Sequence, residues 1–219
     1  MPNDGGHLML SPEEKTDLLT REPKAASWIR RLLGSEEFLN NKERWCLWLV
    51  GISPDELRSM PAIMERVEAV RHTRLASSRS TTQELAATPS LFGEIRHPTK
   101  GHYLLIPSVS SEKRAYIPIG FMPSEVVSTN LNLIVPGAEL YHLGVLSSST
   151  HMAWVRSVCG RLKSDYRYSA GIVYNNFPWP ENVTGKQRQA IEEAAQAVLN
   201  ARAKYPGASL ADLYDPVTM

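Results

Sequence analysis

The chain has 219 residues, of which 42% are hydrophobic and 21% charged, as in globular proteins that bury a substantial core. Its 24 Lys and Arg residues nearly balance 23 Asp and Glu residues, and the net charge of +1 excludes neither nucleic-acid nor protein partners, because the basic residues are unevenly placed. No apolar run approaches the roughly 20 residues of a membrane span, so we expect no membrane partner.

The polar start of the chain lacks the apolar core of a signal peptide. Cys46 and Cys159 both lie in apolar settings. Free thiols in a reducing compartment are the simplest interpretation of two such cysteines, and we therefore expect a cytoplasmic protein.

The first third of the chain predicts mainly helices. Ser11 to Glu14 combines a capping residue with proline and acids in the first turn, which is typical of a helix start. We expect a short helix over Lys24 to Leu33, and a buried strand over Arg44 to Val50. Ser53-Pro54 opens another helix. A long helix follows Pro61, with its apolar face made by Met60, Ile63, Met64, Val67 and Val70.

The central region predicts β-structure, because short apolar runs alternate with turns rich in Pro, Gly and Ser. The expected strands are Leu91 to Ile95, Tyr103 to Ile106, Tyr116 to Ile119 and Leu131 to Val135. The polar loops between them are where recognition residues of a sheet scaffold usually lie. Their candidate binding residues are Arg96, His97, Lys100, Ser110, Lys113 and Arg114.

The last third predicts helices around one strand. Leu143 to Leu146 resembles a short buried strand, and the hydroxyls after it can cap a helix that carries Met152, Val155, Cys159 and Leu162 at helical spacing. A turn over Asp165 to Tyr168, a strand over Ile172 to Tyr174 and an amphipathic helix from Lys186 to Lys204 are expected next. The predicted fold class is therefore α+β: N-terminal helices, a central mixed or antiparallel β region, and C-terminal helices around one strand.

Two groups of basic residues are candidate phosphate contacts. The first follows the long helix and contains Arg71, Arg74 and Arg79. Cations that favourably end a helix are an equal alternative for this group. The second group combines hydroxyls, guanidinium groups and aromatic rings, which hold phosphates and contact base edges. Its members are Ser148, Ser149, His151, Arg156, Arg161, Lys163, Arg167 and Tyr168. A packed helix with solvated arginines is the alternative for this second group.

Catalytic and metal-binding motifs are missing from the sequence. A methyltransferase takes up its cofactor at a glycine-rich turn after a strand, but Gly5-Gly6 has no strand before it. Asn176-Phe177-Pro178 only superficially resembles the Asn/Asp-Pro-Pro-aromatic motif of amino-methylating enzymes. The six histidines have no Cys or His neighbour at ligand spacing. We expect this chain to bind neither a metal nor a cofactor, and to catalyse nothing by itself.

Several segments resemble large restriction–modification DNA methyltransferases of the MmeI-like (type IIL or IIG) kind. They are Met1 to Gly6, Glu43 to Trp48, Leu91 to Arg96, Tyr116 to Phe121, Gly144 to Pro180 and, within it, Tyr174 to Pro180. The resemblance covers nearly the whole chain. It implies the target-recognition domain and C-terminal segment of an adenine-N6 methyltransferase with restriction activity, whose upstream domain binds S-adenosylmethionine and whose substrate is duplex DNA.

On this resemblance, residues 1–58 lead into a recognition domain at 59–180, and 181–219 form a C-terminal helical segment. Arg161, Lys163 and Arg167 would contact phosphates or fix the turn, whereas the loop residues and the cap at Ser147 to His151 would contact bases. Loop side chains that are merely solvated are the alternative to base contacts. A protein-interaction module that docks to a partner subunit through Trp and Met surfaces is the alternative function. Salt-sensitive binding to duplex DNA distinguishes the two.

Overall fold

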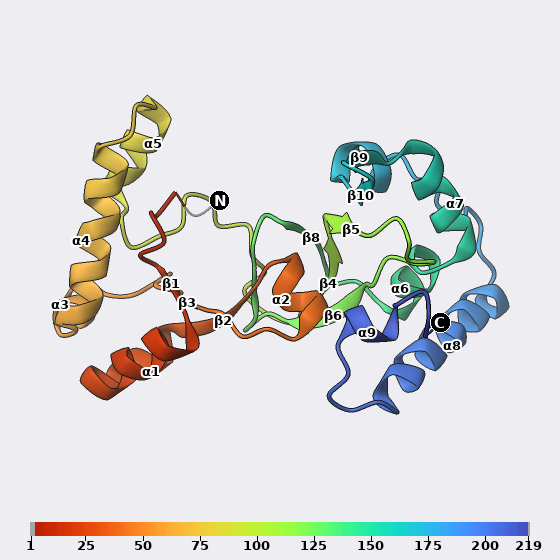
Figure 1. Cartoon of the computed structure of the whole chain (residues 1–219), viewed down its shortest axis with the longest axis horizontal. Coiled ribbons are helices and arrows are strands. Elements are labelled where there is room, and N and C mark those ends of the chain that lie inside the picture. The colour runs from red at the N-terminus through yellow and green to blue at the C-terminus, as the bar shows by residue number, and fades with distance from the viewer. Residues whose placement is uncertain (1–2, 219) are drawn as a thin grey trace. The chain divides into compact units, whose positions relative to one another are not determined.

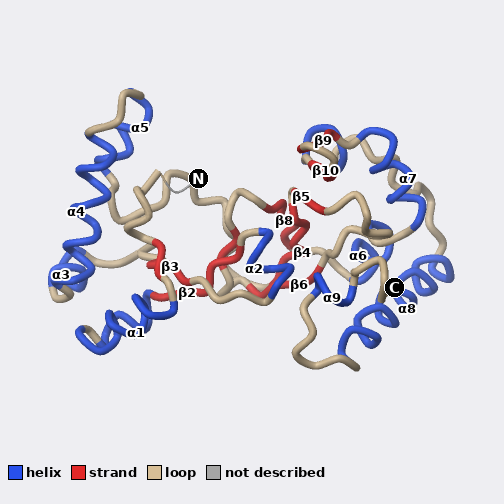
Figure 2. The backbone as a smooth tube through the Cα atoms, in the orientation of Figure 1, coloured by secondary structure: helices blue, strands red, loops and turns tan. Residues whose placement is uncertain are grey.

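The computed structural model describes residues 3–218, in which helices alternate with short strands and long loops (Figure 2). The fold class is α+β, as predicted, with strands in three small open sheets. The chain divides into two compact units. Unit 1 comprises residues 3–32, 43–97 and 125–127, and unit 2 comprises residues 33–42, 98–124 and 128–218.

Unit 1 combines a four-stranded sheet with helices (Figure 1). The sheet order is β1 (Met9–Leu10), β3 (Trp45–Leu47), β2 (Ile29–Leu33) and β7 (Val127–Ser128). The helical elements are α1 (Pro12–Arg21), the 3-10 segment η1 (Pro23–Trp28), α3 (Pro54–Arg58), α4 (Pro61–Leu75), α5 (Ser80–Glu84) and the 3-10 turn η2 (Leu85–Ala87).

The predicted starts of α1 and α3 are confirmed by their capping bonds. The Ser11 hydroxyl accepts the Glu14 amide at 3.1 Å, and the Glu14 carboxylate accepts the Ser11 amide at 2.8 Å. The Ser53 hydroxyl accepts the Glu56 amide in the same way. The predicted apolar face of α4 is also confirmed, because Met60, Ile63, Val67 and Val70 are buried in the core of unit 1. Met64 is only half-buried.

Two predicted elements of unit 1 are wrong. The helix over Lys24 to Leu33 is instead η1 followed by β2, since Ile29 and its successors pair with β3 in the sheet. The strand over Leu91 to Ile95 does not form. The Leu91 carbonyl accepts a hydrogen bond from the Arg74 guanidinium, at 2.6 Å, where a strand would use a neighbouring backbone amide.

Unit 2 holds two three-stranded sheets and the other helices of the described residues. One sheet has the order β6 (Gly120–Pro123), β4 (His102–Pro107) and β8 (Asn132–Pro136). The other has the order β5 (Val109–Ser110), β10 (Asp165–Arg167) and β9 (Gly160–Leu162). The helices are α2 (Ser35–Asn40), α6 (Leu140–Leu146), α7 (Ser149–Val158), the π-helix η3 (Ala170–Tyr174), α8 (Gly185–Ala203) and α9 (Leu210–Leu213).

The strand predicted over Leu143 to Leu146 is a helix, α6, which packs against α8. Gly144 permits this contact: a β-carbon there would lie 2.6 Å from the Ile191 side chain and 2.8 Å from its carbonyl oxygen. The glycine therefore serves the close approach of two helices. The predicted helix over Lys186 to Lys204 is confirmed as α8.

The predicted strand over Ile172 to Tyr174 is also wrong. Ser169 caps a π-helical turn there, and the Trp154 indole N–H donates to the Val173 carbonyl at 2.9 Å. The predicted turn over Asp165 to Tyr168 is a strand, β10, because the preceding helix ends at Val158 and the chain returns as a hairpin. Leu162 consequently lies in β9 and not in the helix.

In the first sheet of unit 2 the expectations are mostly correct. The strands predicted over Tyr103 to Ile106 and Leu131 to Val135 are confirmed as β4 and β8. The strand predicted over Tyr116 to Ile119 is wrong, because pairing with β4 begins only at Gly120 and the strand is β6. Every helix within residues 3–218 is too short or too polar to cross a bilayer, and both cysteines are free, as predicted.

Candidate nucleic-acid interface

The basic group that ends α4 in unit 1 does not act as one surface. Arg71 and Arg79 are exposed, but Arg74 is fully buried. Its guanidinium donates to the carbonyl oxygens of Asn3, Leu85, Thr88 and Leu91 at 2.6–2.9 Å. Arg74 therefore connects the N-terminal loop and the segment after α5 to helix α4. Its buried side chain is not accessible to a phosphate.

Three further candidates follow in the chain. Arg96 of unit 1 is exposed and pairs with Glu94 at 3.2 Å. His97 is half-buried, with its ring edge-on to Trp48 at a centroid distance of 5.7 Å. Lys100 of unit 2 is exposed in the loop before β4. Of these, Arg96 and Lys100 have the accessibility that a phosphate contact needs.

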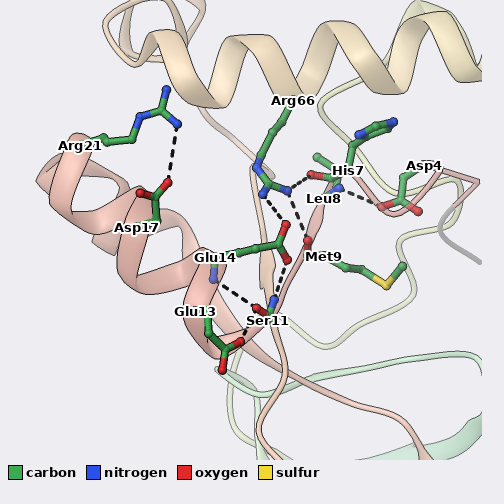
Figure 3. Close-up of polar contacts among 10 residues, drawn as sticks. All are labelled: Asp4, His7, Leu8, Met9, Ser11, Glu13, Glu14, Asp17, Arg21 and Arg66. Atoms are coloured by element: carbon green, nitrogen blue, oxygen red, sulfur yellow. Dashed lines mark hydrogen bonds and ion pairs between the residues drawn. The ribbon is translucent and has the colours of Figure 1, made fainter.

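A cavity of 460 Å³ in unit 1 is lined by α1, α4 and the loop at Gly5 and Gly6. Figure 3 shows how its charges pair among themselves. Arg66 donates to the Glu14 carboxylate at 2.7 Å and to the His7 carbonyl at 3.0 Å. The Ser11 amide, and then Arg66, hold the pKa of Glu14 below its usual value. Asp17, Glu65 and Arg21 also lie on its wall, and Arg21 pairs with Asp17 at 3.6 Å. Three carboxylates against two guanidinium groups make the cavity unsuited to a polyanion.

The hairpin of β9 and β10 in unit 2 presents cations to solvent, because Arg161, Lys163 and Arg167 are all exposed. The Arg161 side chain is oriented by two residues of the same hairpin, Ser164 and Tyr166. Its guanidinium donates to the Ser164 carbonyl at 3.0 Å and lies 4.1 Å from the centre of the Tyr166 ring. These contacts orient a charged group without burying it.

A polar turn at residues 111–115 is anchored beside this hairpin. The Glu112 amide donates to Asp165 at 3.3 Å, and the Glu112 carboxylate lies 3.9 Å from Arg161. The exposed Arg156 of α7 donates to the Ala115 carbonyl at 3.0 Å. The turn itself carries Lys113, which is exposed, and Arg114, which is half-buried. Apart from Lys100, which lies in the loop before β4, the sequence-predicted cations of unit 2 thus gather around one hairpin.

Glu112 and Tyr166 are not among the sequence-predicted site residues, although both contact Arg161. The pairing of Tyr166 with Arg161 across the strands could have been inferred only from the correct hairpin register. Predicting a turn where β10 lies removed that signal.

The start of α7 divides into an exposed and a buried part. Ser148 caps the helix by accepting the His151 amide at 3.1 Å, and Ser149 is exposed. The His151 ring is fully buried, 3.0 Å from the Tyr168 hydroxyl and edge-on to Phe177. Burial lowers the pKa of His151 to about 4, so the imidazole is neutral at physiological pH.

Burial overturns four of the predicted DNA contacts. Arg74 and His151 are 0% exposed, and Ser110 and Tyr168 are each 2% exposed. A phosphate or a base edge cannot reach these side chains in the folded units, and they act in packing. The exposed candidates are Arg71, Arg79, Arg96, Lys100, Lys113, Ser149, Arg156, Arg161, Lys163 and Arg167, and the half-buried ones are His97, Arg114 and Ser148. Within residues 3–218, no group of three His, Cys, Asp or Glu side chains could hold a metal ion.

Residues 1–181 match the family model of the MmeI target recognition domain, and residues 183–219 match that of the MmeI C-terminal domain. The chain belongs to the MmeI family. The resemblance found in the sequence is thereby confirmed, and it extends from the recognition domain of the family into its C-terminal domain.

Two relatives support the MmeI assignment. DNA methyltransferase A of Bacillus subtilis (strain 168) is 42% identical over the whole chain, which covers 25% of that protein. The type IIL restriction–modification enzyme MmeI, whose structure was solved in complex with DNA, is 49% identical with a TM-score of 0.96. The chain is covered completely in that comparison and spans 29% of the MmeI chain. It therefore corresponds to between a quarter and a third of these relatives.

Proposed function

We propose that this chain is the target-recognition module of a DNA methyltransferase in a restriction–modification enzyme, and that it binds duplex DNA. The exposed cations around the β9–β10 hairpin are the observation that carries the proposal. Lys and Arg side chains that neutralise phosphates provide most of the sequence-independent affinity for DNA. The solved relative at 49% identity is itself a complex with DNA.

The accessible residues divide into two roles in this proposal. Arg161, Lys163 and Arg167 contact phosphates and so fix the position of the module on the duplex. The turn at residues 111–115 is held against the hairpin and offers Lys113 and Arg114 to base edges. Arginine and lysine pair with the O6 and N7 acceptors of guanine, and a good bidentate pair discriminates by about 1–3 kcal/mol.

In the full-length enzyme, an upstream domain of the same chain would bind S-adenosylmethionine, flip an adenine out of the duplex and methylate its N6 amino group. The module described here needs no cofactor for its part. We propose that residues 59–180 do the recognition, that residues 1–58 lead into them, and that residues 181–219 support the module as a helical segment. The enzyme would act on DNA in the cytoplasm.

Equilibrium binding of the chain to duplex DNA between about 50 and 300 mM salt tests this function. With several phosphate contacts, the log–log slope of affinity against salt should be steeper than about −2. Arg167→Ala should make the slope shallower by about 1, whereas the exposed Arg21→Ala, outside the hairpin group, should not change it. An affinity that does not respond to salt would instead favour the protein-interaction module.

Sequencing of methylated sites in the full-length enzyme tests the division of roles. Arg167→Ala should lower methylation equally at all sequences, because a phosphate contact carries no base information. Lys113→Ala or Arg114→Ala should relax the preference at single positions of the site. If these two variants keep the parental site while Arg167→Ala changes it, the two roles are reversed.

A further inference from the structure

The tip of the β9–β10 hairpin, residues 162–165, carries an exposed apolar side chain. Leu162 is 49% exposed, and all three residues of β9 are exposed, because β9 is the edge strand of its sheet. Leu162 pairs with Asp165, so the connecting loop has only the two residues Lys163 and Ser164. Strand β5 pairs with Tyr166 and Arg167, and the pair of Leu162 with Asp165 lies beyond it.

Leu162 points away from the core of unit 2. Side chains alternate along a strand, and residues paired across two strands share a face. Arg161 shares the inner face with the buried Tyr166, whereas Leu162 shares the outer face with Asp165 and Arg167. Gly160 lies opposite Arg167 and adds no side chain, so Leu162 and Arg167 dominate this face.

The loop keeps a charged side chain at an unfavourable backbone position. Lys163 has φ of +56°, a region that costs most L-residues roughly 1–2 kcal/mol. Within residues 3–218, the other non-glycine residues with positive φ are Asn3, Asn41 and Asn182, and asparagine tolerates that region. Of these four residues Lys163 alone carries a charge, and its side chain is exposed.

The positive charge around Leu162 favours an anionic binding partner. Residues 160–167 carry three cations and one carboxylate, for a net charge of +2, and the carboxylate of Asp165 accepts the Glu112 amide. The neighbouring turn adds Lys113 and Arg114 against Glu112. An apolar side chain framed by cations fits a surface that offers both phosphates and apolar edges, which is the surface of a DNA groove.

We propose that the β9–β10 tip enters the major groove of the duplex, where Leu162 makes apolar contact with base edges and Lys163 contacts a phosphate. The major groove admits a two-stranded β-ribbon, and the thymine methyl group offers an apolar partner there. This assignment rests on the proposed function and adds to it a base-contacting residue that carries no charge and no hydrogen-bonding group.

Parallel binding to duplex DNA and to heparin tests the assignment, because heparin is a polyanion without bases. Leu162→Ala should bind duplex DNA about 5-fold more weakly than the wild type, from the lost apolar contact, with the same salt slope. It should elute from heparin at the wild-type salt concentration. Leu162→Met should retain wild-type affinity for DNA. The matched control is Leu131→Ala, since Leu131 is 52% exposed in the same unit and should change neither measurement.

The outcomes separate this inference from the function on which it rests. If the wild type binds duplex DNA with a steep salt slope but Leu162→Ala binds equally well, the groove contact is wrong and the proposed function stands. If the wild type shows no salt-dependent binding, both fail. A change of oligomeric state in Leu162→Ala, measured by sedimentation, would show that a second copy covers Leu162 and would also overturn the assignment.

Discussion

Each unit buries one basic residue that its sequence context places among candidate DNA contacts, Arg74 in unit 1 and His151 in unit 2. Arg74 remains charged and donates to the backbone carbonyls of four residues. The His151 ring contacts the Tyr168 hydroxyl, and the lowered pKa of the imidazole keeps it neutral. Guanidinium cannot lose its proton in a protein and must therefore be satisfied by acceptors, whereas imidazole can be buried uncharged.

The exposed cations of the β9–β10 hairpin differ from both. Arg161 is oriented by Tyr166 and Ser164 at the surface, and Lys163 and Arg167 are exposed. A basic residue near a polar loop is thus compatible with three environments: a saturated buried charge, a buried neutral ring and a free surface cation. Only the last suits a salt-dependent contact with phosphate.

The largest expected effect is on Arg74. Arg74→Ala leaves the carbonyls of Asn3, Leu85, Thr88 and Leu91 without this donor. We expect the free energy of unfolding to fall by about 3–5 kcal/mol, as when one partner of a buried charged network is removed. Urea unfolding measures it. Arg71→Ala, on the exposed side of the same helix, should change it by less than about 0.5 kcal/mol. A stable Arg74→Ala protein that loses DNA affinity would contradict the structural role.

The next effect concerns His151 and pH. Its pKa is lowered from 6.5 in the unfolded chain to about 4 in the fold, so the unfolded state binds a proton first as the pH falls. The free energy of unfolding should therefore be constant above about pH 6.5 and drop by about 2 kcal/mol between about pH 6.5 and 5. Urea unfolding measured across this pH range checks it. In His151→Gln, the free energy of unfolding should depend less on pH by this amount. An unchanged slope in the variant would show that other groups cause it.

The smallest effect concerns Lys163, and its two parts have opposite signs. Lys163→Gly relieves the positive φ and should stabilise the fold by about 0.5–1 kcal/mol. The same change removes one phosphate contact and should make the salt slope of DNA binding shallower by about 1. Thermal unfolding and salt titration of one variant measure both. If Lys163→Gly is stabilised and binds as the wild type does, the lysine has no role on DNA.

Local chemistry predicted much of the fold. Capping residues located the starts of α1, α3 and α7, and apolar periodicity located α4 and α8, because these signals lie within a few consecutive residues. The predictions that were wrong concern elements whose conformation depends on tertiary contacts. Leu143 to Leu146 became a helix through its contact with α8, and Ile172 to Tyr174 became a π-helical turn beside Trp154. Short apolar runs do not distinguish a buried strand from a buried helix.

The candidate site was predictable in composition but not in burial. Arg161, Lys163 and Arg167 were identified from their clustering, and they are exposed. Arg74 and His151 were placed among them because a sequence does not show where a side chain points. Leu162 was predicted to lie on the apolar face of a helix. It is exposed instead, because that helix ends at Val158 and the chain continues as a hairpin.

The most direct test of recognition by this chain is a chimera with a relative. Residues 1–181, which match the target recognition domain, would replace the corresponding segment of DNA methyltransferase A of Bacillus subtilis. Sequencing of methylated sites would then compare the chimera with its recipient. Our account predicts that the methylated sequence changes to the one specified by residues 1–181. An active chimera that still methylates the recipient's sequence would contradict it.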